Sequence, residues 1–191
     1  PDSGTVWRQP ALKVARLVQD VPLTSTKTVN EIVAEGLTGL IGHDAEDWLR
    51  DHKVDLILSK LDLDGEARVD TLSGGWRRRV LLARALAVQA KVLLMDEPFG
   101  ALDINTRLQM QDLLEDVWLK FQPTIVFVTH DIEEAVYLAD DIYIMAANPG
   151  RFVHHISVDL PFNRNLEVKH SAEFNEIVRH VEDRMIEVSK L

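Results

Sequence analysis

Hydrophobic residues recur every three or four positions between Thr28 and Leu61, a spacing that predicts helices. Thr28 and Glu31 fit a capping box, in which each side chain accepts a hydrogen bond from the other residue's backbone amide. Asp44 is placed to cap a second helix. The apolar positions that define the two helices are Val29, Ile32, Val33, Leu37 and Leu40 in the first, and Trp48, Leu49, Leu56 and Ile57 in the second.

From residue 72 onward, short apolar runs alternate with amphipathic stretches. A turn at 72–75 opens a helix that reaches about residue 88, and further helices are predicted at 104–121, 132–139 and in the tail around Phe174 to Met185. Buried strands are predicted at 92–95, 124–129 and 142–145, and a strand-like stretch ends at 14–18. This alternation favours an α/β domain with a parallel sheet.

Composition narrows the classes of protein that fit. The 191 residues suit one domain, and 46% of them are hydrophobic, which is enough to bury a core. With 21 basic and 31 acidic residues the formal charge is −10, which argues against direct nucleic-acid binding by the surface as a whole. The chain has no cysteine, no apolar run of about 20 residues and no signal peptide, so a cytoplasmic protein is expected.

Two adjacent carboxylates, Asp96 and Glu97, end the apolar run at 92–95. A strand of a parallel sheet directs its carboxyl end toward a ligand crevice. One carboxylate there can hold Mg²⁺, and the next can orient or deprotonate a water that attacks a phosphate. Taken alone, the pair is equally compatible with a strand end that meets solvent.

Three other segments carry candidate chemistry. Ser73, Gly74 and Gly75 precede a helix, so their amides and the helix dipole form an anion site, although a Ser-Gly-Gly turn is more often only a helix cap. His130 follows the strand at 124–129 and can bond a terminal phosphate or hold a water. Gln19 ends an early strand and can reach a metal or a water. Each residue taken alone is more often structural.

The order of these motifs along the chain resembles that of the ABC ATPase family. The matching segments are Gln19 for the Q-loop, 72–75 for the signature, 92–97 for the Walker B strand and its catalytic glutamate, 100–103 for the D-loop and His130 for the switch histidine. The resemblance covers essentially the whole chain. It implies a single partial domain over 1–191 with a P-loop NTPase-like parallel sheet, a helical insertion at 28–71 and a C-terminal extension at 151–191.

The family's mechanism implies roles for these residues. Two ATPase subunits close over two ATP molecules and drive a membrane permease, which implies a homodimer held peripherally at the inner face of the cell membrane. The roles that the resemblance implies are Mg²⁺ binding for Asp96 and Gln19, general base catalysis for Glu97, stabilisation of the γ-phosphate and water for His130, γ-phosphate binding across the dimer for Ser73, Gly74 and Gly75, and a connection between the two sites for Asp103.

The finer resemblance is divided. Segments 97–103 and 129–135 resemble ATPases of nitrate, sulfonate and taurine importers, whereas 72–79 and 1–70 more closely resemble the ribosome-acting ABC-F class. The favoured function is therefore the ATPase subunit of an importer. A fragment of an ABC-F protein and a non-catalytic remnant that acts as an interaction module are the alternatives. The basic run Arg77-Arg78-Arg79 favours a solvated helix face over a contact with RNA.

One family motif does not occur in the sequence. No G-x-x-x-x-G-K-[ST] phosphate loop is present, and in the family this loop lies upstream of the turn matching 1–4. The domain is therefore expected to be truncated before the phosphate-loop helix, and the chain alone is expected not to hydrolyse ATP. In the family the phosphate-loop strand lies between the strands matching 124–129 and 142–145, so a gap rather than direct pairing is expected between these two strands.

Overall fold

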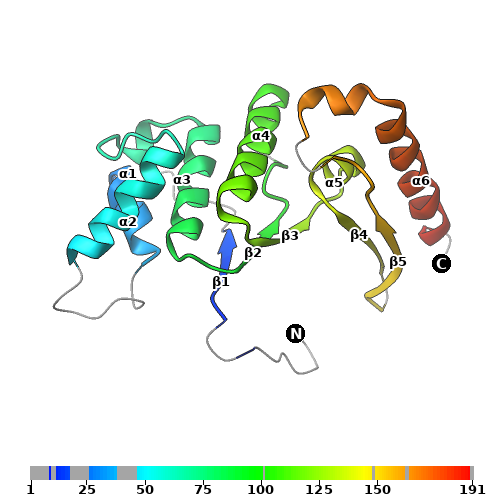
Figure 1. The fold of residues 1–191 in the computed structure, drawn as a ribbon, viewed down its shortest axis with the longest axis horizontal. Helices are drawn as coiled ribbons and strands as arrows, with labels where there is room; N and C mark the ends of the chain where they lie inside the picture. The colour runs from blue at the N-terminus through cyan, green and yellow to red at the C-terminus, as the bar shows by residue number, and fades with distance from the viewer. Residues whose placement is uncertain are drawn as a thin grey trace.

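Strands and helices alternate along the chain in the computed structural model, which describes residues 9, 12–17, 26–37, 47–100, 102–147, 149–161 and 164–189 (Figure 1). The elements in order are β1 (Val14–Leu17), α1 (Val29–Glu35), α2 (Asp47–Lys60), the 3₁₀ helix η1 (Val69–Thr71), α3 (Gly74–Ala87), β2 (Val92–Asp96), α4 (Ile104–Phe121), β3 (Thr124–Val128), α5 (Ile132–Leu138), β4 (Asp141–Ala146), β5 (Arg151–Ser157), the 3₁₀ helix η2 (Leu166–His170) and α6 (Ala172–Val188).

A three-stranded parallel sheet in the order β1-β2-β3 confirms the predicted α/β class. Leu17 of β1 lies opposite Met95 of β2, and Asp96 of β2 lies opposite Val128 of β3. The carboxyl ends of the three strands therefore meet at one edge of the sheet. Helices α3 and α4 contact each other beside this sheet (Figure 1).

The predicted strand at 142–145 forms as β4, outside the three-stranded parallel sheet. It pairs antiparallel with β5 in a separate ribbon that has an irregularity between Ile144 and Met145. The two strands are close in sequence, and a short turn can join an antiparallel pair directly. Within the described strands β3 and β4 do not pair with each other, which confirms the expected gap.

Two hydrophobic cores lie under these elements. The first joins β1, β2 and the helices α1 to α4, with Val33, Val80 and Val117 almost fully buried. The second joins α5, the β4–β5 ribbon and α6, around Tyr137 and Phe174. The predicted helices at 104–121 and 132–139 form as α4 and α5, each beginning after a side-chain cap.

The long helical region predicted at 28–61 divides into α1 and α2 in the described residues. Thr28 forms the predicted capping box with Glu31, since both reciprocal hydrogen bonds are present. Asp44 and Leu40 lie outside the described residues. The division of the chain into an insertion at 28–71 and an extension at 151–191 stays a prediction.

The burial expected of the strand at 124–129 is wrong. Val126 and Val128 of β3 are 46% and 47% exposed, and β2 buries only alternate residues, Leu93 and Met95. Only one face of the sheet is therefore well covered in the described part of the chain.

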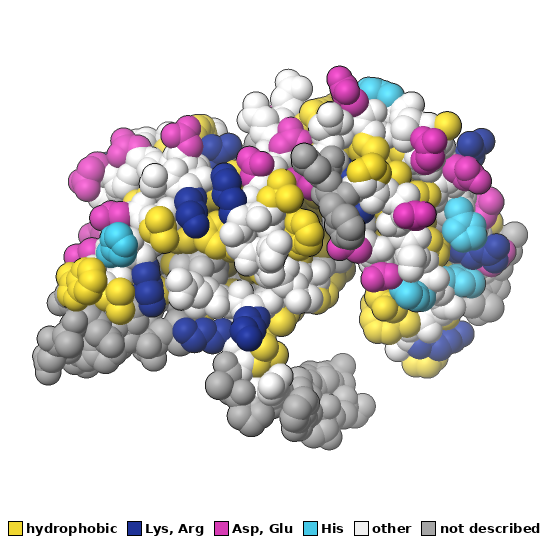
Figure 2. Space-filling view, viewed as in Figure 1, with side chains coloured by type: hydrophobic (Ala, Val, Ile, Leu, Met, Phe, Trp, Pro, Cys, Tyr) yellow, Lys and Arg dark blue, Asp and Glu magenta, His cyan; other side chains and the backbone are white. Residues whose placement is uncertain are grey.

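Hydrophobic side chains also gather over the end of the β4–β5 ribbon, at the lower right of Figure 2, where Phe152 is 67% exposed. No described helix combines the length and apolar character needed to cross a bilayer.

Candidate functional site

Asp96 and Glu97 lie where β2 reaches the carboxyl edge of the sheet, as predicted. Apolar Leu93 and Met95 hold the strand in the core, and the chain then leaves the sheet at Glu97. Glu97 has a φ of 42°, in the left-handed region that only a few per cent of residues other than glycine adopt. Its amide donates to the carbonyl oxygen of Val128 at 2.8 Å, which ties this turn to the end of β3. Unusual backbone of this kind clusters at functional sites.

Glu97 and His130 come together across the ends of β2 and β3. The Oε1 atom of Glu97 lies 3.0 Å from Nδ1 of His130, and the two side chains are 47% and 75% exposed. An ion pair this open to water contributes about 0–1 kcal/mol to stability, so the fold does not depend on it. With Nδ1 donating to the carboxylate, the second ring nitrogen and the second carboxylate oxygen remain available for a ligand or a water.

Asp96 has a cationic neighbour that the sequence analysis did not single out. Nη2 of Arg16 on β1 lies 3.6 Å from Oδ2 of Asp96, and both side chains are substantially exposed. The parallel register explains the contact, because Arg16 pairs with Leu94 and its long side chain reaches the end of the adjacent strand. Gln19, the other predicted metal ligand, lies outside the described residues.

The segment matching the signature caps helix α3. Oγ of Ser73 accepts from the amide of Trp76 at 3.4 Å, so Ser73 is the N-cap and Gly74 begins the helix. A Cβ atom added at Gly74 would meet no atom within 4 Å. Gly75 differs, because a Cβ atom there would overlap Cγ2 of Thr106. The N-terminus of α3 therefore lies against the N-terminus of α4, and its role as an anion site stays a prediction.

The expectation that the basic run forms a solvated face is wrong for two of its members. Nε and Nη2 of Arg77 donate to the carbonyl oxygens of Val69 and Asp70, and Nη1 of Arg79 donates to that of Leu61. The guanidinium of Arg79 also lies 4.5 Å from the centre of the Trp76 ring. Arg77 therefore holds the 3₁₀ turn before Ser73, and Arg79 bonds the chain just after α2, because the last carbonyls of helices lack partners of their own.

Asp103 is the N-cap of α4 and lies beside the α3 N-terminus. Its Oδ1 accepts from the amide of Thr106 at 3.0 Å, and its Oδ2 accepts from the Thr106 hydroxyl at 2.6 Å. The hydroxyl hydrogen bond, followed by the amide one, holds the pKa of Asp103 below its ordinary value. Ser73, Gly74, Gly75 and Asp103 are thus brought together by the contact between the two helix starts.

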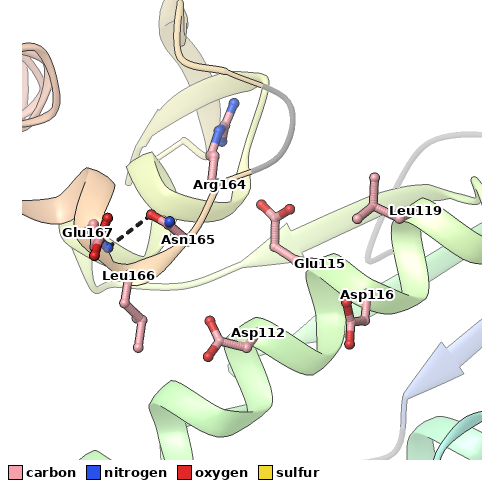
Figure 3. A pocket seen from close by; sticks show the side chains of 8 residues that line it. All are labelled: Asp112, Glu115, Asp116, Leu119, Arg164, Asn165, Leu166 and Glu167. Carbon is pink, nitrogen blue, oxygen red and sulfur yellow. Dashed lines mark hydrogen bonds between the residues drawn. The ribbon is translucent and has the colours of Figure 1, made fainter.

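A separate pocket of about 450 Å³ lies between α4 and residues 164–167 (Figure 3). Its lining includes the α4 side chains of Asp112, Glu115 and Asp116 and no residue of the predicted site. Burial raises the pKa of the Glu115 carboxyl, and nearby Arg164 opposes the shift. The Arg164 guanidinium itself bonds the carbonyl oxygens of Val136, Tyr137 and Ala139 at the end of α5. This pocket is therefore distinct from the edge of the sheet that carries Glu97 and His130.

The donors at the sheet edge fit a nucleotide-bound Mg²⁺ ion. In sites of this kind, Mg²⁺ takes one or two protein carboxylates and fills its remaining positions with phosphate oxygens and water. Asp96 can supply one carboxylate. No group of three or more potential metal-ligating side chains occurs among the residues that the structure describes, so these residues do not form a metal cage of their own.

Comparison with known proteins gives the family. A profile of the ABC transporter family matches residues 1–100. The taurine import ATP-binding protein TauB of Pseudomonas syringae pv. tomato is 43% identical over 171 residues, which are 88% of this chain and 64% of that protein. TauB of Pseudomonas putida is 53% identical over 112 residues, 58% of this chain and 43% of that protein.

The fold agrees with this match. The fold is similar to the structure of cbiO1 from Clostridium perfringens, part of the ABC transporter complex cbiONQ. The alignment covers 94% of this chain and 68% of the cbiO1 chain, with a TM-score of 0.68 and 22% sequence identity. The chain spans about half the length of several curated relatives that it matches. The family profile covers more than half of the chain. This chain belongs to the ABC transporter family, as an ATP-binding domain.

Proposed function

We propose that this chain is part of the ATP-hydrolysing subunit that powers an ABC importer for taurine or a similar anion, such as another sulfonate or nitrate. The observation that carries the proposal is the 3.0 Å contact between Glu97 and His130 at the ends of neighbouring parallel strands. The two relatives from Pseudomonas are named for taurine import, which supports the class of substrate.

Glu97 acts as the general base in this proposal. Its half-exposed carboxylate can accept a proton from a water that attacks the terminal phosphate. The left-handed backbone at Glu97 sets the direction in which this side chain leaves the main chain. His130 orients the same water and hydrogen-bonds the terminal phosphate. Asp96, together with Gln19, holds Mg²⁺, which when bound neutralises charge on the phosphates.

The open N-terminus of α3 serves a second subunit. Ser73, Gly74 and Gly75 present backbone amides to the γ-phosphate of an ATP held mainly by the partner copy, and Asp103 beside them connects the two sites. The proposed partners are therefore a second copy of the subunit and a membrane permease. The proposed location is the inner face of the cell membrane.

Hydrolysis is proposed for the full-length protein that contains this chain. The 191 residues hold no phosphate-loop motif, and preorganised charge around the phosphates supplies most of the rate in such sites. Purified chain with Mg-ATP is expected to show background turnover only. Turnover within tenfold of about 1 s⁻¹, an ordinary enzyme rate, would contradict this part.

The test of the proposal compares full-length variants. Glu97→Gln is expected to lower kcat by about 10²- to 10⁴-fold, the usual contribution of a general base, while ATP still binds. Glu133→Gln is the matched control, because it neutralises an exposed carboxylate three residues from His130. The readouts are phosphate release and equilibrium binding of Mg-ATP.

Transport tests the substrate class. The subunit reconstituted with its permease is expected to accumulate taurine inside vesicles in an ATP-dependent way.

Near-normal turnover by Glu97→Gln would exclude Glu97 as the base and make His130 the leading candidate. Binding to ribosomes without any effect of taurine would favour the ABC-F alternative.

A further inference from the structure

Arg107 contacts residues that lie next to His130 and Asp103 in the chain, both of which have proposed functional roles. Arg107 lies in the first turn of α4, where its Nη1 is 3.3 Å from Oδ2 of Asp131 and its Nη2 donates to the carbonyl oxygen of Leu102 at 3.4 Å. Leu102 immediately precedes Asp103, and Asp131 immediately follows His130. One guanidinium thus bridges the start of α4 and the start of α5.

Asp131 is held from two further directions. Its Oδ1 accepts from the amide of Glu134 at 3.0 Å and caps α5, and its own amide donates to Oγ1 of Thr129 at 3.0 Å. His130 lies between these anchored residues. Any displacement of Asp131 therefore moves the backbone that carries the His130 ring.

Leu102 belongs to a turn that begins at Glu97. The amide of Leu102 donates to the Phe99 carbonyl oxygen at 3.1 Å, and the amide of Gly100 donates to the Glu97 carbonyl oxygen at 3.3 Å. Phe99 is buried, with its ring centre 5.6 Å from that of Phe127 on β3. The turn that leaves Glu97 is therefore packed against the sheet before it reaches Arg107.

Together these contacts close a ring. It runs from Glu97 through the turn to Leu102, across the Arg107 guanidinium to Asp131, and back through His130 to Glu97. We infer that Arg107 is a positioning residue that holds the His130 side chain within hydrogen-bond distance of Glu97. Through its contact with Leu102 it also connects this pair to Asp103 at the start of α4. The inference deepens the proposed function and rests on it.

The chemistry of arginine suits this position. The planar guanidinium can donate to a carboxylate and a carbonyl at once, whereas a lysine ammonium is a point charge without that fixed fork. The Arg107 and Asp131 side chains are 31% and 35% exposed, so water partly screens the pair and weakens its contribution to stability. Loss of the Arg107–Asp131 pair is therefore expected to change the position of His130 more than the stability of the fold.

The experiment measures kcat, KM for ATP, Mg-ATP affinity and melting temperature of the full-length subunit. Arg107→Gln is expected to lower kcat by about 10- to 100-fold, the scale of a misplaced catalytic group, with KM, affinity and melting temperature nearly unchanged. Arg107→Lys is expected to recover part of the rate. Asp131→Asn keeps an oxygen to cap α5 and is expected to reproduce the loss, and the double variant is expected to be no slower than either single one.

Arg84→Gln is the matched control. Arg84 pairs with Glu35 at 3.7 Å and is 39% exposed, and it lies in α3 rather than in either turn. Equal losses of kcat in Arg84→Gln and Arg107→Gln, or additive losses in the double variant, would overturn the inference. If Arg107→Gln does not fold, Asp131→Asn decides the question by the same measurements. Normal rates in Arg107→Gln and Asp131→Asn, with Glu97→Gln inactive, would overturn this inference alone, whereas unchanged turnover in Glu97→Gln would overturn the proposed function.

Discussion

The two adjacent glycines at the start of α3 are expected to respond oppositely to alanine. A Cβ atom at Gly74 would enter open space, whereas one at Gly75 would overlap Cγ2 of Thr106. Both positions lie in the first turn of the helix, so both substitutions remove chain entropy from the unfolded state. The difference between the two variants therefore isolates the contact between α3 and α4.

The magnitude follows from how firmly Thr106 is held. Its hydroxyl donates to Asp103 and its amide donates to the same carboxylate, so rotating the side chain away breaks a cap hydrogen bond. A β-branched side chain is also stiff at χ1. Overpacking costs about 1–3 kcal/mol, whereas replacing glycine by alanine in a helix gains about 0.5–1 kcal/mol. Gly74→Ala is thus expected to be neutral or stabilising, and Gly75→Ala to be less stable than Gly74→Ala by about 1–3 kcal/mol.

Chemical denaturation of the two variants gives the comparison directly. The rescue variant is Thr106→Ser in the Gly75→Ala background, because serine keeps the hydroxyl that bonds Asp103 and lacks Cγ2. It is expected to recover most of the lost stability. Equal stabilities for Gly74→Ala and Gly75→Ala, or no recovery with Thr106→Ser, would refute the reasoning that the two helix starts are in contact.

Three further predictions concern the rest of the molecule. Gly36→Ala is expected to cost about 1–3 kcal/mol in denaturant melts, because the new Cβ atom would overlap the backbone oxygen of Arg84, which cannot move independently of α3. Burial raises the folded-state pKa of Glu115, so the protonated carboxyl is stabilising below the unfolded pKa and stability falls as pH rises through the folded pKa. Glu115→Gln should therefore raise the melting temperature at pH 7 and have little effect near pH 4, and an equal effect at both values would contradict this. The isolated chain is expected to self-associate through exposed apolar strands, and Phe152→Ser should weaken the association in sedimentation experiments, whereas a monomer at high concentration would exclude it.

Local sequence signals predicted the elements well because their causes are local. The Thr28 capping box and the Ser73 cap depend on residues three positions away, and the helix at 104–121 depends on apolar periodicity within one segment. The adjacency of Glu97 and His130 could also be anticipated, because the ends of neighbouring parallel strands meet at one edge. The resemblance to a family supplied the roles that these signals do not contain.

The interactions that the sequence analysis missed join residues far apart in the chain. Arg107 in α4 and Asp131, the N-cap of α5, are 24 positions apart, so no local period connects them. The same holds for Arg16 and Asp96, which meet through strand register. The exposure of Val126 was missed because an apolar run indicates a strand without saying which of its faces other elements cover.

The proposed catalytic pair owes its geometry to contacts other than its own. The Glu97–His130 ion pair is too exposed to hold two loops in place, and a left-handed glutamate is by itself unfavourable. The Glu97 backbone is held instead by the Val128 carbonyl oxygen and by Phe99 packing on Phe127, and His130 by the anchored Asp131. Because the side chains contribute little to the fold, the proposed exchange of their mutual contact for contacts with a water and a phosphate would leave the surrounding structure intact.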